Sequence, residues 1–397
     1  MPWVFQLGVE MVLRAILAPG ILAVRWLASA PPALADGMPA ARRSLVRAAK
    51  AALDEIFFVT EVLSARFVTA ADRSWLDAEV REALALFEAK GWLDAPATYH
   101  RTPPPLTSVT LRPCRSLSRH YLHLTFESGY EPHPGEPGRE RWLGYGPNHT
   151  AHAWVLEHAG APRPWLVCLH GYRTGFPLTA FIQFPPAWLH HGLGLNVLVP
   201  VLPLHGPRTV GRRSGEGFAS GAFLDTIHLQ AQALWDVRRL LGWLRARHAP
   251  AIGVYGVSLG GATAALLAGL EPSLSCVIAA MPAHDLIGLA RRHVPTFLLI
   301  LAERLGVAWD GVERLLRVIS PLALTPHVAH ERRFLFGGVA DRLVPATHVS
   351  ALWRHWDRPR LGWHNGSHLS FSFESTVRTL VLEALVTTGM VARPPVP

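Results

Sequence analysis

Residues 255–267 read YGVSLGGATAALL and place Ser258 between two glycines that each stand two positions away. An apolar run leads into this serine and a stretch of small residues follows it, which indicates a strand, a sharp turn and a helix. A nucleophilic serine needs such a turn, because the turn lifts its hydroxyl clear of the sheet. Side chains at Gly256 and Gly260 would collide across this turn. An incidental serine in a glycine-rich turn is the other interpretation, and the strand–turn–helix context favours the functional one.

Short apolar runs alternate with helical stretches on both sides of this motif. The runs that read as buried strands are WLVCLHG (165–171), LNVLVPVLP (195–203), SCVIAAMP (275–282) and RRFLFGGVAD (332–341). Helical stretches such as residues 222–247 separate them. This alternation predicts an α/β fold with a mostly parallel sheet that helices flank on both faces. Because sites in such sheets lie beyond the carboxyl ends of the strands, the residues that follow each run are the candidates for function.

Backbone donors for a developing negative charge are expected near Ser258. His170, Gly171 and Tyr172 follow an apolar run that lies two strands ahead of the serine strand. Attack on an ester produces an oxyanion, which two preorganised N–H groups would stabilise. Leu259 and Tyr172 are the predicted donors, and His170 and Gly171 are predicted to contact the substrate. An ordinary turn at the end of a strand would also explain His-Gly.

An acid and a base follow later strands. Asp341 ends an apolar run, whereas its rival Asp285, after the preceding run, could equally cap a helix. The stretch PRLGWHNGSHLSF (359–371) contains two histidines. We favour His368, in a loop before a helix, over His364, which lies inside the strand-like part. A carboxylate fixes the tautomer of a catalytic histidine and stabilises its charged form.

The chain order of these residues resembles that of the α/β-hydrolase superfamily over residues 117–390. The motifs that carry the resemblance are His170-Gly171-Tyr172, Gly256-Val257-Ser258-Leu259-Gly260, Asp341 within GVADRLVP, and Gly366-Ser367-His368. The resemblance implies that Ser258 is the nucleophile, Asp341 the acid and His368 the general base. It also implies that Tyr172 and Leu259 form an oxyanion hole.

The chemistry implied by the resemblance is acyl transfer to water through a covalent acyl-enzyme, with no cofactor. We expect a serine hydrolase of the carboxylesterase or lipase type that acts on apolar acyl esters or lipids. An acyltransferase, a thioesterase or a peptidase would use the same triad. A non-catalytic scaffold with this fold is expected to lack a member of the triad, and here all three positions are occupied.

The expected domain organisation has three parts. Residues 1–95 are interpreted as a helical extension, residues 96–116 as a linker and residues 117–390 as the catalytic domain. Residues 285–319 contain apolar helical segments between two strands and are expected to form a cap over the site. In the loop 202–218, Arg208, Arg212 and Arg213 are interpreted as solvated charge rather than as ligands of a substrate carboxylate or phosphate.

Composition and charge argue against several other classes of protein. The chain carries a formal charge of +9, but only 17% of its residues are charged and its lysines are Lys50 and Lys90 alone. No nucleic-acid-binding module accompanies this charge. Its three cysteines are widely spaced and indicate neither a disulfide framework nor a metal site. Uncharged residues 15–24 are too few to span a membrane. We therefore expect a cytoplasmic enzyme whose N-terminal helices contact a membrane surface peripherally at most.

Overall fold

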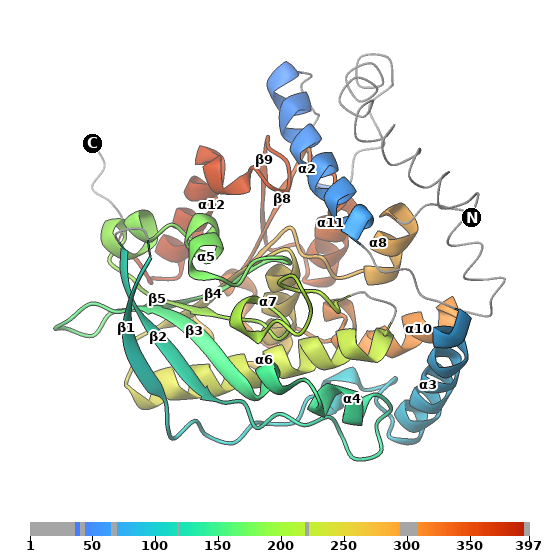
Figure 1. Cartoon of the computed structure of the whole chain (residues 1–397). Coiled ribbons are helices and arrows are strands. Elements are labelled where there is room, and N and C mark those ends of the chain that lie inside the picture. Colours follow the sequence, from blue (N-terminus) through green and yellow to red (C-terminus); the bar gives the residue numbers. More distant parts are fainter. Residues whose placement is uncertain are drawn as a thin grey trace.

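One mixed sheet organises the residues that the structure describes (Figure 1). The computed structural model describes residues 36–39, 44–64, 70–116, 119–218, 222–293 and 308–392. Within these ranges the strand order is β1-β2-β3-β5-β4-β6-β7-β8-β9. The strands are β1 (Thr110–Ser116), β2 (Arg119–Glu127), β3 (Thr150–Leu156), β4 (Trp165–Leu169), β5 (Asn196–Pro200), β6 (Ile252–Val257), β7 (Cys276–Ala280), β8 (Arg333–Gly338) and β9 (Arg360–His364).

The type of strand pairing changes once across the sheet, from antiparallel to parallel at β5. Strands β1, β2, β3 and β5 pair antiparallel, and every pair from β5 through β4 to β9 is parallel. The predicted mostly parallel sheet is therefore confirmed. Strand β1 lies inside the stretch 96–116 that we expected to be a linker, so that boundary is corrected. The reason is that β1 is an edge strand with mostly exposed residues and Pro113 at its centre, and it lacks the apolar pattern of a core strand.

Helices cover both faces of the sheet. The described helices are α2 (Leu45–Ser64), α3 (Ala70–Ala89), α4 (Arg139–Leu143), α5 (Pro177–Gln183), α6 (Phe223–Ala246), α7 (Leu259–Leu270), α8 (Leu286–His293), α10 (Trp309–Leu316), α11 (Ala346–His355) and α12 (Ser375–Thr387). Side chains of α6, α7 and α11 form one hydrophobic core with one face of the sheet. Those of α5 and α12 form a second core with the opposite face. This two-sided covering agrees with the expected α/β class.

The N-terminal helices pack against the rest of the molecule. Helix α3 lies beside α10 at one end of α6 (Figure 1), and the three share a core with Phe87, Ile227 and Leu315. The segment 285–319, expected to be a cap, is helical where it is described, as α8 and α10. Its residues 294–307 lie outside the described ranges. Its role as a cap over the site stays a prediction.

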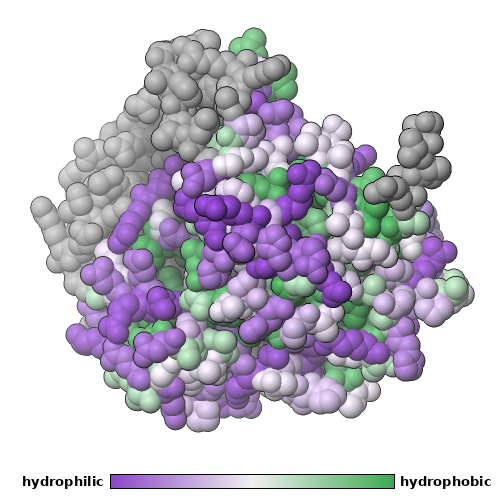
Figure 2. Space-filling view, turned by 180° about the vertical axis from the view of Figure 1, so that it is seen from behind, coloured by the Kyte–Doolittle hydropathy of each residue, from purple (hydrophilic) through white to green (hydrophobic). Residues whose placement is uncertain are grey.

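The surface of the molecule is mainly hydrophilic on one large face. Figure 2 shows that face with small hydrophobic areas scattered between polar side chains. Among the described helices, none is both long enough and apolar enough to cross a membrane. Residues 15–24, the uncharged stretch that we expected to be too short to span a membrane, lie outside the described ranges.

A buried ion pair replaces one of the predicted surface charges. The Arg208 side chain is fully buried, and its Nη1 donates to Asp236 Oδ2 at 2.8 Å and to the Val201 carbonyl at 3.0 Å. Burial lowers the pKa of Arg208 and raises that of Asp236. The interpretation of Arg208 as solvated charge is therefore wrong. Its partner lies 28 residues away on α6, so the sequence around Arg208 could not reveal it.

The Asp236→Ala variant should lower the free energy of unfolding by about 3–5 kcal/mol, because it leaves the Arg208 charge buried without a partner. Chemical denaturation followed by circular dichroism measures this loss. The exposed pair of Arg360 with Glu383 provides the control, since Glu383→Ala should cost no more than about 1 kcal/mol. Equal, small losses in both variants would contradict the buried ion pair.

Candidate active site

Ser258 occupies a strained turn between β6 and α7. Its backbone φ of 58° and ψ of −115° are unusual for a residue with a side chain. The turn is held on both sides, because the Ser258 N–H donates to the Ala280 carbonyl at 2.9 Å and its carbonyl accepts from Ala283 at 3.1 Å. A Cβ on Gly256 would collide with the Gly260 carbonyl, and one on Gly260 with the Leu169 carbonyl. The glycines therefore permit the close approach that the motif predicted.

His368 and Asp341 form a hydrogen-bonded pair beyond the ends of β8 and β9. The Nδ1–H of His368 donates to Asp341 Oδ2 at 2.7 Å, and both side chains are buried. Asp341 is itself fixed, since its Oδ1 accepts from the backbone N–H groups of Leu343 at 2.9 Å and Val344 at 2.8 Å. With Nδ1 protonated in this bond, Nε2 of the neutral ring carries the free lone pair. The arrangement gives His368 the tautomer that a general base needs.

Opposing effects set the pKa of His368. Burial lowers it, whereas the Asp341 carboxylate, its hydrogen bond and the charge of Asp54 raise it, and the net pKa lies above the ordinary 6.5. Within the described residues the Ser258 hydroxyl forms no hydrogen bond. Catalytic hydrogen bonds are often long without substrate and tighten when it binds. The structure thus pairs the predicted acid with the predicted base and presents the serine on its own turn.

The loop after β4 lies against Ser258. A Cβ on Gly171 would contact the Ser258 Cβ at 3.5 Å. The Gly171 N–H donates to the Gln183 side-chain Oε1 at 3.2 Å, so this donor is occupied. Within the described part of the chain, the backbone N–H groups of Tyr172 and Leu259 donate to no protein acceptor, which leaves them available. Gln183 could not be predicted from the sequence, because an isolated glutamine on a helix carries no motif.

The predicted substrate contact at His170 requires a correction. Its ring is fully buried, and burial lowers its pKa to about 4, which keeps the ring neutral. Its Nδ1–H donates to the Gly171 carbonyl at 2.9 Å, and its Nε2 accepts from the Leu202 N–H at 3.1 Å. The side chain therefore holds the loop that carries Gly171 and Tyr172, and it is not exposed to a substrate.

The two rival residues have other roles. Asp285 Oδ1 accepts from the Gly288 N–H at 2.7 Å, which is a cap at the start of α8. His364 is fully buried, its Nδ1 accepts from the Gly366 N–H at 3.2 Å, and burial lowers its pKa to about 4. The structure brings Asp341 and His368 together and assigns neither rival to that pair.

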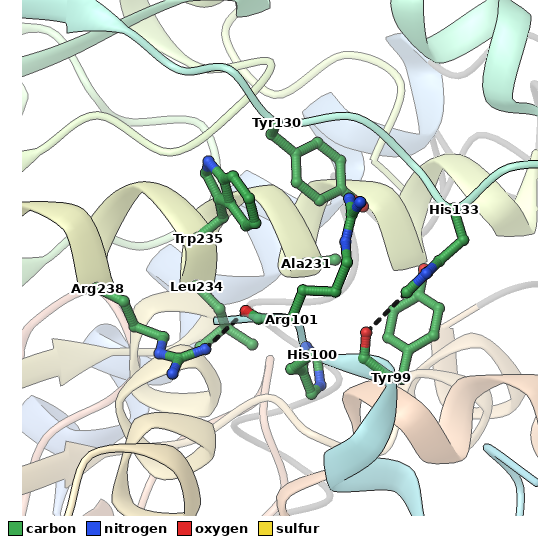
Figure 3. Close-up of a pocket in the computed structure, with 9 residues that line it drawn as sticks. All are labelled: Tyr99, His100, Arg101, Tyr130, His133, Ala231, Leu234, Trp235 and Arg238. Carbon is green, nitrogen blue, oxygen red and sulfur yellow. Dashed lines mark hydrogen bonds between the residues drawn. The ribbon is translucent and has the colours of Figure 1, made fainter. Parts of the chain in front are cut away.

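A small cavity lies elsewhere, between α6 and two other segments, one with Tyr99 and the other with His133 (Figure 3). Its volume of about 10 Å³ holds roughly one water molecule. Nearby, the Tyr99 hydroxyl donates to Glu136 at 2.7 Å, and burial raises the pKa of Glu136 to about 7. The cavity is too small for an ester. Among the described residues, no three His, Cys, Asp or Glu side chains are grouped to hold a metal ion.

Comparison with known proteins places this geometry in a family. No protein-family model matches the chain. The uncharacterized proteins Rv2627c (strain ATCC 25618 / H37Rv) and MT2702 (strain CDC 1551 / Oshkosh) of Mycobacterium tuberculosis are each 40% identical to it over 370 residues. Each match covers 90% of this chain and 86% of the relative. Among solved structures, acetyl xylan esterase 1 from Thermoanaerobacterium sp. JW/SL YS485 is similar, with a TM-score of 0.50 and 15% identity.

The match with this esterase covers 74% of this chain and 93% of the esterase. At 15% identity it shows a similar fold and nothing further. The overall fold of the esterase agrees with the observed sheet and flanking helices. The two mycobacterial relatives are 40% identical to this chain over 90% of its length, which shows that they and this chain form one family. The chain therefore has an α/β-hydrolase fold and belongs to the family that includes Rv2627c and MT2702 of Mycobacterium tuberculosis.

Proposed function

We propose that this protein is a serine hydrolase that cleaves carboxylic esters. Ser258 is the nucleophile, His368 the general base and Asp341 the acid. The observation that carries the proposal is the 2.7 Å hydrogen bond between His368 Nδ1 and Asp341 Oδ2, formed beyond the sheet edge at which the strained turn presents Ser258. A histidine with a purely structural role would not need a buried carboxylate to fix the orientation of its ring.

The first half of the reaction forms the acyl-enzyme. The Ser258 Oγ attacks the ester carbonyl carbon while His368 Nε2 takes the hydroxyl proton. The resulting imidazolium is stabilised by Asp341. The Tyr172 and Leu259 N–H groups donate to the oxyanion, and loss of one such donor typically costs a factor of about 10²–10³ in kcat. His368 then protonates the leaving alcohol oxygen as the carbon–oxygen bond breaks.

The second half hydrolyses the acyl-enzyme. A water molecule takes the place of the alcohol, and His368 Nε2 removes its proton as it attacks the acyl carbon. The same two N–H groups stabilise the second oxyanion. When this intermediate collapses, the Ser258 oxygen leaves and recovers its proton from His368. The protein requires no redox step or cofactor for this sequence of bond changes.

Exposed apolar side chains close in sequence to the site residues support an apolar acyl or alcohol group. Leu369 follows His368 directly and is 38% exposed, and Phe373 is 80% exposed. Helix α5, which follows the Tyr172 loop, exposes Leu178 and Ile182. Large exposed apolar side chains that flank a polar site favour a substrate with an apolar part. The proposal therefore includes lipids and other apolar acyl esters as the substrate class.

The Ser258→Ala variant should lose about 10⁶-fold in kcat for p-nitrophenyl esters, because no other group can form the acyl-enzyme. A spectrophotometric assay with acyl chains of increasing length measures the loss and the preferred chain length. The control is Ser273→Ala. Ser273 lies in the turn between α7 and β7, where its hydroxyl accepts from Arg245 Nη2 at 2.8 Å. This variant should keep wild-type rates. Equal activity of Ser258→Ala and wild type would refute the proposal.

The kcat/KM of the wild type should fall at acidic pH. His368 must be neutral to accept a proton, and its pKa lies above 6.5, so the acidic limb should lie above pH 6.5. This prediction is tested by measuring the pH profile of kcat/KM with two esters that have different leaving groups. If the acidic limb reports a pKa of the free enzyme, it lies at the same pH for both esters. A limb that lies below pH 6.5 would contradict the assignment of His368 as base.

A further inference from the structure

Helix α2, which precedes the sheet in the chain, contacts the loops that carry the candidate residues. Its Asp54 is fully buried. Asp54 Oδ2 accepts from the backbone N–H groups of Arg342 and His368, each at 2.9 Å, and Oδ1 accepts from that of Leu369 at 3.0 Å. One carboxylate thus binds the residue after Asp341, the proposed base itself and the residue after that base.

These three donors belong to two separate loops. Arg342 lies in the loop after β8, whereas His368 and Leu369 lie in the loop after β9. The hydrogen bond of His368 with Asp341 also crosses between these loops. Asp54 therefore fastens the same two loops a second time, through their backbones, and restricts the movement of the imidazole relative to its carboxylate.

The same helix reaches the loop that carries the proposed oxyanion donor. Glu61, two turns after Asp54, accepts from Arg173 Nε at 2.7 Å and from the Tyr172 hydroxyl at 3.2 Å. Toward the other end of α2, Lys50 bonds Glu374 at 2.5 Å. Positions 50, 54 and 61 fall on one side of a helix. The charged side of α2 therefore lies along the loops after β4, β8 and β9.

The position of Asp54 has an electrostatic consequence. Burial and the charge of Asp341 raise its pKa, while His368 and the backbone donors oppose this. The charged or titratable groups that face His368 are Asp341, Asp54 and the buried His364. The Arg342 guanidinium is directed to Glu55, at 3.1 Å. A second carboxylate near the imidazole favours the charged ring, which forms when His368 takes a proton.

We propose that Asp54 is a positioning residue of the active site, which holds His368 against Asp341 and stabilises the imidazolium from a distance. The proposal rests on the proposed function of the triad. It makes the N-terminal extension a working part of the hydrolase, although this part of the chain carries none of the superfamily motifs. Helix α2 supplies the carboxylate, and the loops after β8 and β9 supply the three donors.

Three variants separate positioning from simple helix docking. Asp54→Asn removes the charge and turns an amide NH₂ toward one of the three donors. It should lower kcat/KM about tenfold to a hundredfold, as expected for a misplaced catalytic group. It should also move the acidic limb of kcat/KM to lower pH, because loss of the negative charge lowers the pKa of His368. Asp54→Glu keeps the charge, so its limb should stay at the wild-type pH even if kcat/KM falls.

The control is Glu55→Gln, which removes an equal charge from the next position of the same helix. Glu55 bonds the Arg342 side chain, and its loss should leave kcat/KM and the acidic limb unchanged. Wild-type kcat/KM and an unmoved limb in a folded Asp54→Asn protein would overturn the proposal. If thermal unfolding shows that Asp54→Asn does not fold, Asp54→Glu decides, since wild-type kcat/KM in that variant would overturn the proposal and a reduced value at wild-type Tm supports it.

A spectroscopic readout distinguishes failure of this proposal from failure of the proposed function. The Nδ1–H proton of His368, bonded to Asp341, should give a low-field proton NMR signal that is absent from His368→Gln. In Asp54→Asn this signal should weaken or disappear, and in Glu55→Gln it should persist. A wild type that hydrolyses no ester refutes the proposed function while this comparison still tests Asp54. An unchanged signal in Asp54→Asn would then overturn the positioning role.

Discussion

The arrangement of the site depends on how closely α7 approaches the strands beside it. Gly260 packs against the backbone of β4, Gly256 against the start of α7, and Gly261 against the Ala280 carbonyl at the end of β7. Any side chain at these positions would push the helix away from the sheet. The close approach sets the strained backbone of Ser258, and it also brings the loop of Gly171 against the serine. Every other part of the site is arranged around this turn.

The sequence was sufficient for the parts of the molecule that are encoded locally. The turn at Ser258 could be predicted because its glycines, its strand and its helix are adjacent in the sequence. Buried strands could be recognised as short apolar runs. The pairing of Asp341 with His368, 27 residues apart, followed from their positions after successive strands. Parallel strands end at one edge of a sheet, so residues that follow them meet without any contact being visible in the sequence.

The parts that could not be predicted depend on distant partners. Helix α2 directs charged residues such as Asp54 toward the protein, while Leu45 and Ile56 are exposed by 83% and 52%. This reverses the usual rule for a surface helix, in which apolar residues face the core. Arg208 is similar, because only the fold brings Asp236 to it. In both cases the sequence shows the charge, and the donor or ion that makes its burial tolerable lies elsewhere in the chain.

The central claim is that Ser258 is an activated nucleophile. It is tested most directly by treating the full-length wild-type protein with a fluorophosphonate and locating the adduct by peptide mass spectrometry. The account predicts one covalent adduct, on the peptide that contains Ser258, and no adduct in a folded His368→Ala variant. An unlabelled wild-type protein, or an adduct on another residue, would contradict it.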